Sequence, residues 1–134
     1  MVFADSSGFI SAFDARDAAH PEAARCWHEI AQSAEPVLTT SLVFAETVTF
    51  LRRRAGWEAS RLAGEAILRS RVVEVVHPTS EQIEAAWREM LRIADPKLSL
   101  CDALSFVVMR ERGVTRALTL DRNFSEAGFS RLPR

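Results

Sequence analysis

Lysine is almost missing from the sequence: Lys97 is the only one, and arginine supplies the rest of the seventeen cationic residues. Eighteen acidic residues outnumber them and leave a formal net charge of −1. This balance argues against a protein that binds nucleic acid through overall positive charge. Any contact with nucleic acid must therefore be local.

Cysteine is also scarce. Cys26 and Cys101 form no Cys-x-x-Cys pair and have no histidine at metal-ligand spacing, so neither a zinc site nor a disulfide framework is indicated. The first residues carry no basic segment, and no apolar run is long enough for a signal peptide or a membrane span. These absences predict a cytoplasmic protein in a reducing compartment, with no membrane contact.

No stretch is rich enough in proline, glycine or serine to indicate a linker, and neither repeats nor low-complexity segments occur. A length of 134 residues, with 48% hydrophobic and 26% charged residues, is typical of one globular domain. We therefore expect a single domain over residues 1–134.

Short apolar runs alternate with longer stretches of helical period, which predicts an α/β fold made of βα units around a mostly parallel sheet. Strands are expected at Val2–Ala4, Val37–Thr39, Val72–Val76 and Ala117–Leu120. Helices are expected near residues 7–14, 21–33, 41–54, 57–70, 80–93 and 102–112, and the tail from Asn123 onward is expected to close with a short edge strand.

Two aspartates directly follow predicted strands, Asp5 after the first and Asp121 after the last. The carboxyl edge of an open parallel sheet is where ligands bind, because strands there give way to loops and helix N-termini. Taken alone, each residue is also a favoured helix cap or turn residue. The position of either aspartate by itself leaves both interpretations open.

Two further carboxylates lie on predicted helices. Glu46 falls between Leu42 and Phe50 on a helix that is apolar almost all round, which predicts a buried carboxylate in need of an arginine or a cation. Asp102 ends a Ser-x-x-Asp capping box that begins at Ser99. Capping and metal ligation are compatible there, since one oxygen can serve each.

Considered together, Asp5, Glu46, Asp102 and Asp121 would repel one another strongly at one sheet edge without a cation. Mg²⁺ or Mn²⁺ prefers carboxylate and water oxygens, and such a site suits phosphodiester hydrolysis. No histidine, cysteine or serine nucleophile is then required. The spacing of the three histidines indicates no catalytic triad, so we interpret them as surface or packing residues: His20, His28 and His77.

Five segments, in this order and spacing, carry a resemblance to a known family: Val2–Ser7, Asp17–Ala24, Thr39–Thr47, Leu100–Ser105 and Leu118–Phe124. The chain resembles a PIN domain, in particular a VapC-type toxin of a bacterial toxin–antitoxin pair, over nearly its whole length. The resemblance implies a three-layer α/β/α sandwich, dependence on Mg²⁺ or Mn²⁺, and endonuclease action on RNA. It carries the acidic roles onto the same four residues, Asp5, Glu46, Asp102 and Asp121.

Two supporting positions differ from the commonest pattern of that family. Ser6 stands where threonine is frequent, and either hydroxyl can bond a ligand carboxylate or a phosphate. Asn123 stands where many relatives have a further aspartate. This chain therefore offers one fewer negative charge near the metal, which disfavours a second ion.

The resemblance also implies partners, namely an RNA substrate, a homodimer and an antitoxin that crosses the active-site groove. The run Arg52–Arg54 is compatible with RNA contact or with a solvated helix end whose cations complement the C-terminal dipole. One alternative is a catalytically inactive PIN-like module used only for protein contacts. Another is a magnesium-dependent phosphatase of the haloacid-dehalogenase type, but Asp5 is followed by Ser6 and Ser7 and lacks the required Asp-x-Asp pair.

Overall fold

The computed structural model describes all residues from Met1 to Arg134 and contains five strands and seven helices. In chain order they are β1 (Val2–Ala4), α1 (Ser6–Phe13), α2 (His20–Ser33), β2 (Val37–Thr40), α3 (Ser41–Arg54), α4 (Trp57–Leu68), β3 (Val73–Val76), α5 (Ser80–Ile93), α6 (Leu100–Arg112), β4 (Arg116–Leu118), α7 (Arg122–Glu126) and β5 (Ser130–Leu132). None of the helices is both long and apolar enough to span a membrane.

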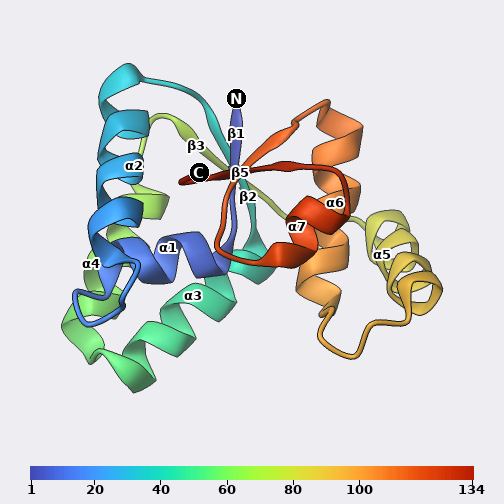
Figure 1. Cartoon of the computed structure of the whole chain (residues 1–134), viewed down its shortest axis with the longest axis horizontal. Helices are drawn as coiled ribbons and strands as arrows, with labels where there is room; N and C mark the ends of the chain where they lie inside the picture. Colours follow the sequence, from blue (N-terminus) through green and yellow to red (C-terminus); the bar gives the residue numbers. More distant parts are fainter.

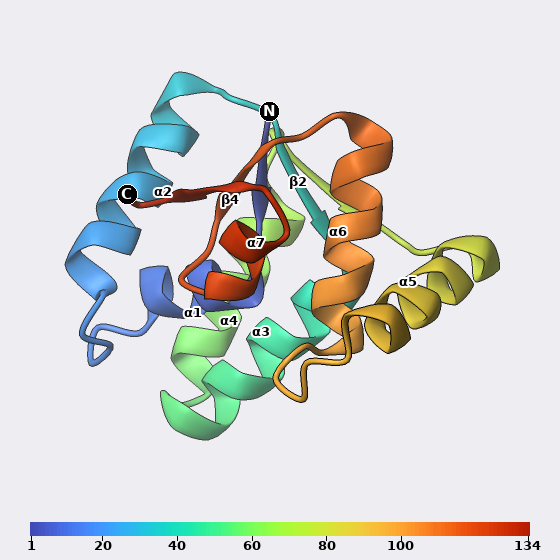
Figure 2. The ribbon, with the colours of Figure 1, turned by 45° about the vertical axis from the view of Figure 1, so that its right-hand side comes forward.

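The five strands form one sheet in the order β3-β2-β1-β4-β5, and every neighbouring pair is parallel. Helices cover both faces of the sheet, which is the middle of three layers: α1 to α4 lie on one side, and α5, α6 and α7 on the other (Figures 1 and 2). The predicted three-layer α/β/α fold is confirmed. The sheet is wholly parallel because the tail strand β5 also pairs in parallel with β4.

The core lies where the central strand meets the helices. All three residues of β1 are fully buried, and α6 buries eight of its thirteen residues, since it packs between the sheet and α5. The edge strand β3 is only partly buried, and its Glu74 is exposed. Central strands covered on both faces must be apolar, whereas an edge strand tolerates a charge.

Several boundaries differ from those expected. Helix α6 begins at Leu100 rather than at Asp102, because Ser99 caps it and places Asp102 at the third position. Strand β4 ends at Leu118, so two residues separate it from Asp121. The short helix α7 was not predicted, since five residues are too few to show a helical period.

The strand order positions a binding crevice. The connections from β1 through β2 to β3 run in one direction, and the chain then crosses to place β4 on the other side of β1. In open parallel sheets this reversal of direction opens a crevice at the carboxyl ends of the two strands. Asp5 follows β1 directly and Asp121 lies just beyond β4, so both are at this crevice.

Candidate metal centre

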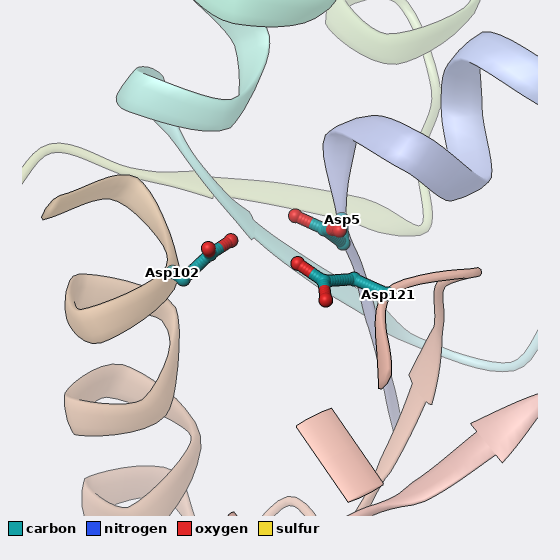
Figure 3. A group of neighbouring side chains, drawn as sticks. All are labelled: Asp5, Asp102 and Asp121. Carbon is teal, nitrogen blue, oxygen red and sulfur yellow. The ribbon is translucent and has the colours of Figure 1, made fainter. Parts of the chain in front are cut away.

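Three aspartates converge at the crevice. Asp5, Asp102 and Asp121 each offer an oxygen, and these oxygens lie within 4.8 Å of one another. Figure 3 shows the side chains pointing toward one another from the end of β1, the first turn of α6 and the segment after β4. No arginine, lysine or histidine forms an ion pair with any of the three.

Asp5 is held rigidly and is only 1% exposed. Its Oδ2 accepts hydrogen bonds from Ser7 Oγ at 2.9 Å and from Thr119 Oγ1 at 3.0 Å. Although Asp5 precedes α1, its side chain makes no capping hydrogen bond. Its other oxygen, Oδ1, is buried without any hydrogen-bond partner.

The charge state of Asp5 reflects this position. Burial, followed by repulsion from Asp102, raises the pKa of Asp5 from 3.8 to about 6, against the lowering effect of the hydroxyl bonds. A buried acceptor oxygen without a partner is costly, and so is an ionised carboxylate beside others. A cation placed among the three aspartates would relieve both costs.

Asp102 combines a local role with a place in the cluster. Ser99 and Asp102 form the predicted capping box, in which Asp102 Oδ2 accepts the backbone N–H of Ser99 at 3.1 Å. Burial raises the pKa of Asp102, and the charges of Asp121 and Glu46 add to the effect, although hydrogen bonds from Ser99 lower it. The cap sets the position of the side chain at the start of α6.

Asp121 also has two roles. Its Oδ1 accepts the backbone N–H of Asn123 at 2.9 Å and caps α7, so the capping interpretation is correct for this residue. The same carboxylate lies in the three-aspartate cluster. Asn123 contributes its backbone to the cap, and it also lines two cavities, one of which Asp121 lines as well.

The prediction that Glu46 is buried was wrong. Glu46 is exposed and lies outside the three-aspartate group, at its rim, where it accepts a hydrogen bond from Ser6 Oγ at 2.6 Å. Helix α3 buries only a narrow stripe, made of Val43, Thr47 and Leu51. Glu46 lies about 100° away from that stripe, so apolar neighbours on both sides did not make it a core position.

Cys101 lies near the acidic cluster, in the first turn of α6. Burial, together with the charges of Glu46, Asp5 and Asp102, raises the pKa of its thiol strongly. A thiol in such surroundings stays protonated at neutral pH and is a poor nucleophile. This agrees with an active site that uses carboxylates alone.

Three residues that hold the cluster were missed in the sequence. Ser7 Oγ accepts the backbone N–H of Leu120 at 3.0 Å, and Thr119 Oγ1 accepts that of Asp121 at 3.0 Å. Together with their bonds to Asp5, these hydroxyls tie the start of α1 to the segment after β4. Gly8 lets the two backbones approach, since a Cβ there would lie 2.3 Å from the carbonyl oxygen of Leu118. The only sequence signals were a threonine in an apolar run and a glycine inside a helix.

Replacing Thr119 with valine should test this tie. Valine keeps the shape but removes the donor to Asp5 and leaves the Asp121 N–H without its acceptor, which should cost about 1–3 kcal/mol of folding stability. Mn²⁺ affinity, measured by isothermal titration calorimetry, should fall roughly 10–100-fold, as is typical when the support of a ligand is lost. Thr119→Ser retains the hydroxyl and should restore most of the affinity; equal affinity in both variants would show that the hydroxyl has no such role.

The donor set fits a hard divalent cation. It offers carboxylate oxygens only, one of them buried without a partner, and no cationic side chain forms an ion pair with them. Fold and site thus define a class of α/β proteins with an acidic cluster, capable of binding a divalent metal, at the switch point of a parallel sheet.

Comparison with known proteins identifies the family within this class. A model of the PIN domain matches residues 2–130, and the chain belongs to the PIN domain family. It is 40% identical over 129 residues to the 23S rRNA-specific endonuclease VapC20 of Mycobacterium tuberculosis, strains CDC 1551 / Oshkosh and ATCC 25618 / H37Rv, covering 96% of this chain and 95% of the relative. The crystal structure of M. tuberculosis VapC20, described as a sarcin-ricin loop cleaving toxin, matches with a TM-score of 0.86 and 39% identity over 96% of each chain.

These matches confirm the predicted membership of the PIN family and the likeness to VapC-type ribonuclease toxins. The alternative of a haloacid-dehalogenase-like phosphatase is therefore set aside. The alternative of an inactive PIN-like module has less support, because the relative is named as an endonuclease and the three aspartates of this chain are all present.

Proposed function

We propose that this chain is a metal-dependent endoribonuclease, the toxin of a cytoplasmic toxin–antitoxin pair, in which Asp5, Asp102 and Asp121 bind Mg²⁺ or Mn²⁺. The observation that carries the proposal is the unpartnered, buried Oδ1 of Asp5 beside two further carboxylates. A bound divalent cation would supply positive charge for the scissile phosphate and lower the pKa of a bound water.

The remaining residues have separate roles in this proposal. Hydrolysis forms a bond between a water oxygen and phosphorus, breaks one phosphoester bond, and moves a proton from the water to the leaving oxygen. Glu46, exposed at the rim of the cluster, orients the attacking water and accepts its proton, while the Ser6 hydroxyl holds the Glu46 carboxylate in place. The hydroxyls of Ser7 and Thr119 keep Asp5 in position.

Ribosomal RNA is the substrate class that we propose, from the name of the M. tuberculosis relative at 40% identity. The structural relative is described as cleaving the sarcin-ricin loop, and we propose a hairpin of this kind for the present chain. Incubating the purified protein with a synthetic sarcin–ricin hairpin and with an unrelated hairpin tests the choice. Equal cleavage of both would contradict the specificity but not the nuclease activity.

Thermal unfolding with and without Mn²⁺ tests the metal site directly. An ion that binds the folded protein and not the unfolded chain stabilises the folded state by mass action. At an ion concentration about a hundred times Kd the free energy of unfolding rises by about 2.7 kcal/mol, and the melting temperature rises with it. In Asp102→Asn this shift should largely disappear, because a charged ligand is lost while an amide oxygen still caps α6. The absence of any shift in the wild-type protein would remove the main support for the site.

The partner protein is proposed to inhibit by inserting an arginine among Asp5, Glu46 and Asp121. A guanidinium bonds carboxylates bidentately and would take the place of the metal in this cluster. Replacing that arginine with glutamate in the co-purified partner should abolish inhibition of RNA cleavage. Full inhibition by an arginine-free partner would indicate steric blocking instead.

A homodimer is also proposed, supported by the exposed apolar side chains of Trp87 and Leu91 on α5. Light scattering on the purified chain measures the oligomeric state.

A further inference from the structure

A groove leads away from the acidic cluster along α7. Its first part is a cavity of about 400 Å³ that is lined by Asp121 itself, by Asn123 and by the loop between α5 and α6. Its second part is a cavity of about 330 Å³, and the two parts share Asn123 and Glu126. The helices and the loop that form this α7 groove lie on the same side of the sheet (Figure 1).

The first part carries two cations that are free to bind a ligand. Lys97, the only lysine of the chain, and Arg122 both line it, and neither forms an ion pair within the chain. Asp95 holds the loop, since its Oδ1 accepts the backbone N–H of Lys97 at 2.9 Å. This bond fixes the backbone of Lys97 at the cavity that Asp121 also lines.

The second part differs in chemistry. Four of its eight lining residues are apolar, including Phe106 and Leu98, while Arg110 and Asn123 provide polar groups. Arg110 is already paired with Glu89, so it is a weaker candidate for phosphate than Lys97. An apolar cavity with a few polar groups suits a flat heterocycle better than a phosphate.

We propose that the α7 groove binds the RNA strand next to the scissile phosphate, with Lys97 and Arg122 holding the neighbouring phosphate and the second cavity taking the adjoining base. The inference rests on the proposed nuclease function. It adds the path that the bound RNA strand follows away from the scissile phosphate. Asn123 favours this use, because an aspartate there would add a negative charge to the path of the backbone. The first part is lined by Asp121 and by two further carboxylates, those of Asp95 and Glu126. The charges of Lys97 and Arg122 are therefore needed to offset these negative charges when a phosphate binds.

Binding of two labelled probes, measured by fluorescence anisotropy in Mn²⁺, tests both parts of the groove. One probe is a 2′-deoxyoligonucleotide, and the other is an abasic sugar–phosphate strand of equal length. Lys97→Gln and Arg122→Gln should each lower the affinity for both probes about tenfold, which is the effect of losing one charge-assisted contact. Each should also reduce the slope of log affinity against log salt by about 0.7. Ala127→Leu, which fills the second cavity, should weaken only the probe that carries bases.

Arg71→Gln is the matched control. It removes the same charge from an exposed arginine just before β3, at the amino edge of the sheet and therefore opposite the cluster. Its affinities should equal those of the wild type. Unchanged binding in Lys97→Gln and Arg122→Gln, or an equal loss in Arg71→Gln, would overturn the groove. Intact probe binding without any RNA cleavage by the wild-type protein would instead count against the nuclease function.

Discussion

Replacing Asp5 with asparagine should reduce RNA cleavage by about a thousandfold or more while the protein remains folded. The loss of a charged metal ligand removes several kcal/mol of transition-state stabilisation, and each 1.36 kcal/mol corresponds to about tenfold in rate. Asparagine keeps the shape of the side chain, and its amide oxygen still accepts hydrogen bonds from the hydroxyls of Ser7 and Thr119. The rate is measured in Mn²⁺ on a fluorogenic RNA, with folding checked by circular dichroism.

The same variant should be more stable than the wild type when metal is chelated. Because the folded protein raises the pKa of Asp5 from 3.8 to about 6, the native state binds its proton more tightly than the unfolded chain does. Stability therefore falls as the pH rises between these two values, by about 3 kcal/mol in total, and Asp5→Asn lacks this loss. Urea unfolding in EDTA should show the two proteins diverging from pH 4 to pH 7, with the variant the more stable at pH 7.

Glu22→Gln serves as the control for both measurements. Glu22 is exposed in the first turn of α2, away from the cluster, so its neutralisation should change neither cleavage nor the pH profile appreciably. Wild-type cleavage by folded Asp5→Asn protein, free of contaminating nuclease, would mean that the proposed mechanism is wrong. A variant that is less stable than the wild type at pH 7 in EDTA would contradict the electrostatic account of Asp5.

Gly8→Ala should destabilise the protein by about 3 kcal/mol and remove most of the activity. A Cβ at this position meets the Leu118 backbone, at 2.3 Å from O and 2.7 Å from C, so either α1 or β4 must move. The clash outweighs the gain of about 1 kcal/mol that alanine brings to a helix interior. Movement of α1 separates Ser7 from Thr119 and loosens Asp5, which is measured as a lower melting temperature and a weaker Mn²⁺-induced shift.

Gly64→Ala on α4 makes the same chemical change where there is room. Its Cβ would lie 3.5 Å from Val48 Cγ1, an ordinary contact, so the variant should be as stable as the wild type or up to about 1 kcal/mol more stable. Activity should be unchanged. If both glycine variants behaved alike, the close approach of α1 to β4 would have no functional importance.

Local signals in the sequence were sufficient for much of the fold. Apolar runs followed by helical periods indicated four of the five strands, and the tail after Asn123 indicated the last. The Ser99–Asp102 capping box was recognisable because its two partners are three residues apart. The place of Asp5 at the sheet edge was also recognisable from near neighbours, because Asp5 directly follows a short apolar strand.

Contacts between distant segments were beyond the reach of local patterns. Thr119 and Asp5 are 114 positions apart, and nothing near either residue predicts their hydrogen bond. The exposure of Glu46 depends on which stripe of α3 faces the core, which packing against α1 and α4 decides. The crossover that places β4 beside β1 likewise follows from burying both faces of the sheet.

The sequence by itself determined which residues are chemically able to bind a metal, and it determined the short segments that carry them, because strand and helix periodicity and capping depend on near neighbours. Only the tertiary structure decided that Asp5, Asp102 and Asp121 lie within 4.8 Å while Glu46 remains at the rim. It also decided that one oxygen of Asp5 is buried without a partner. The physical reason is that distance and burial are set by the packing of whole elements around a common core, to which each residue contributes only a part.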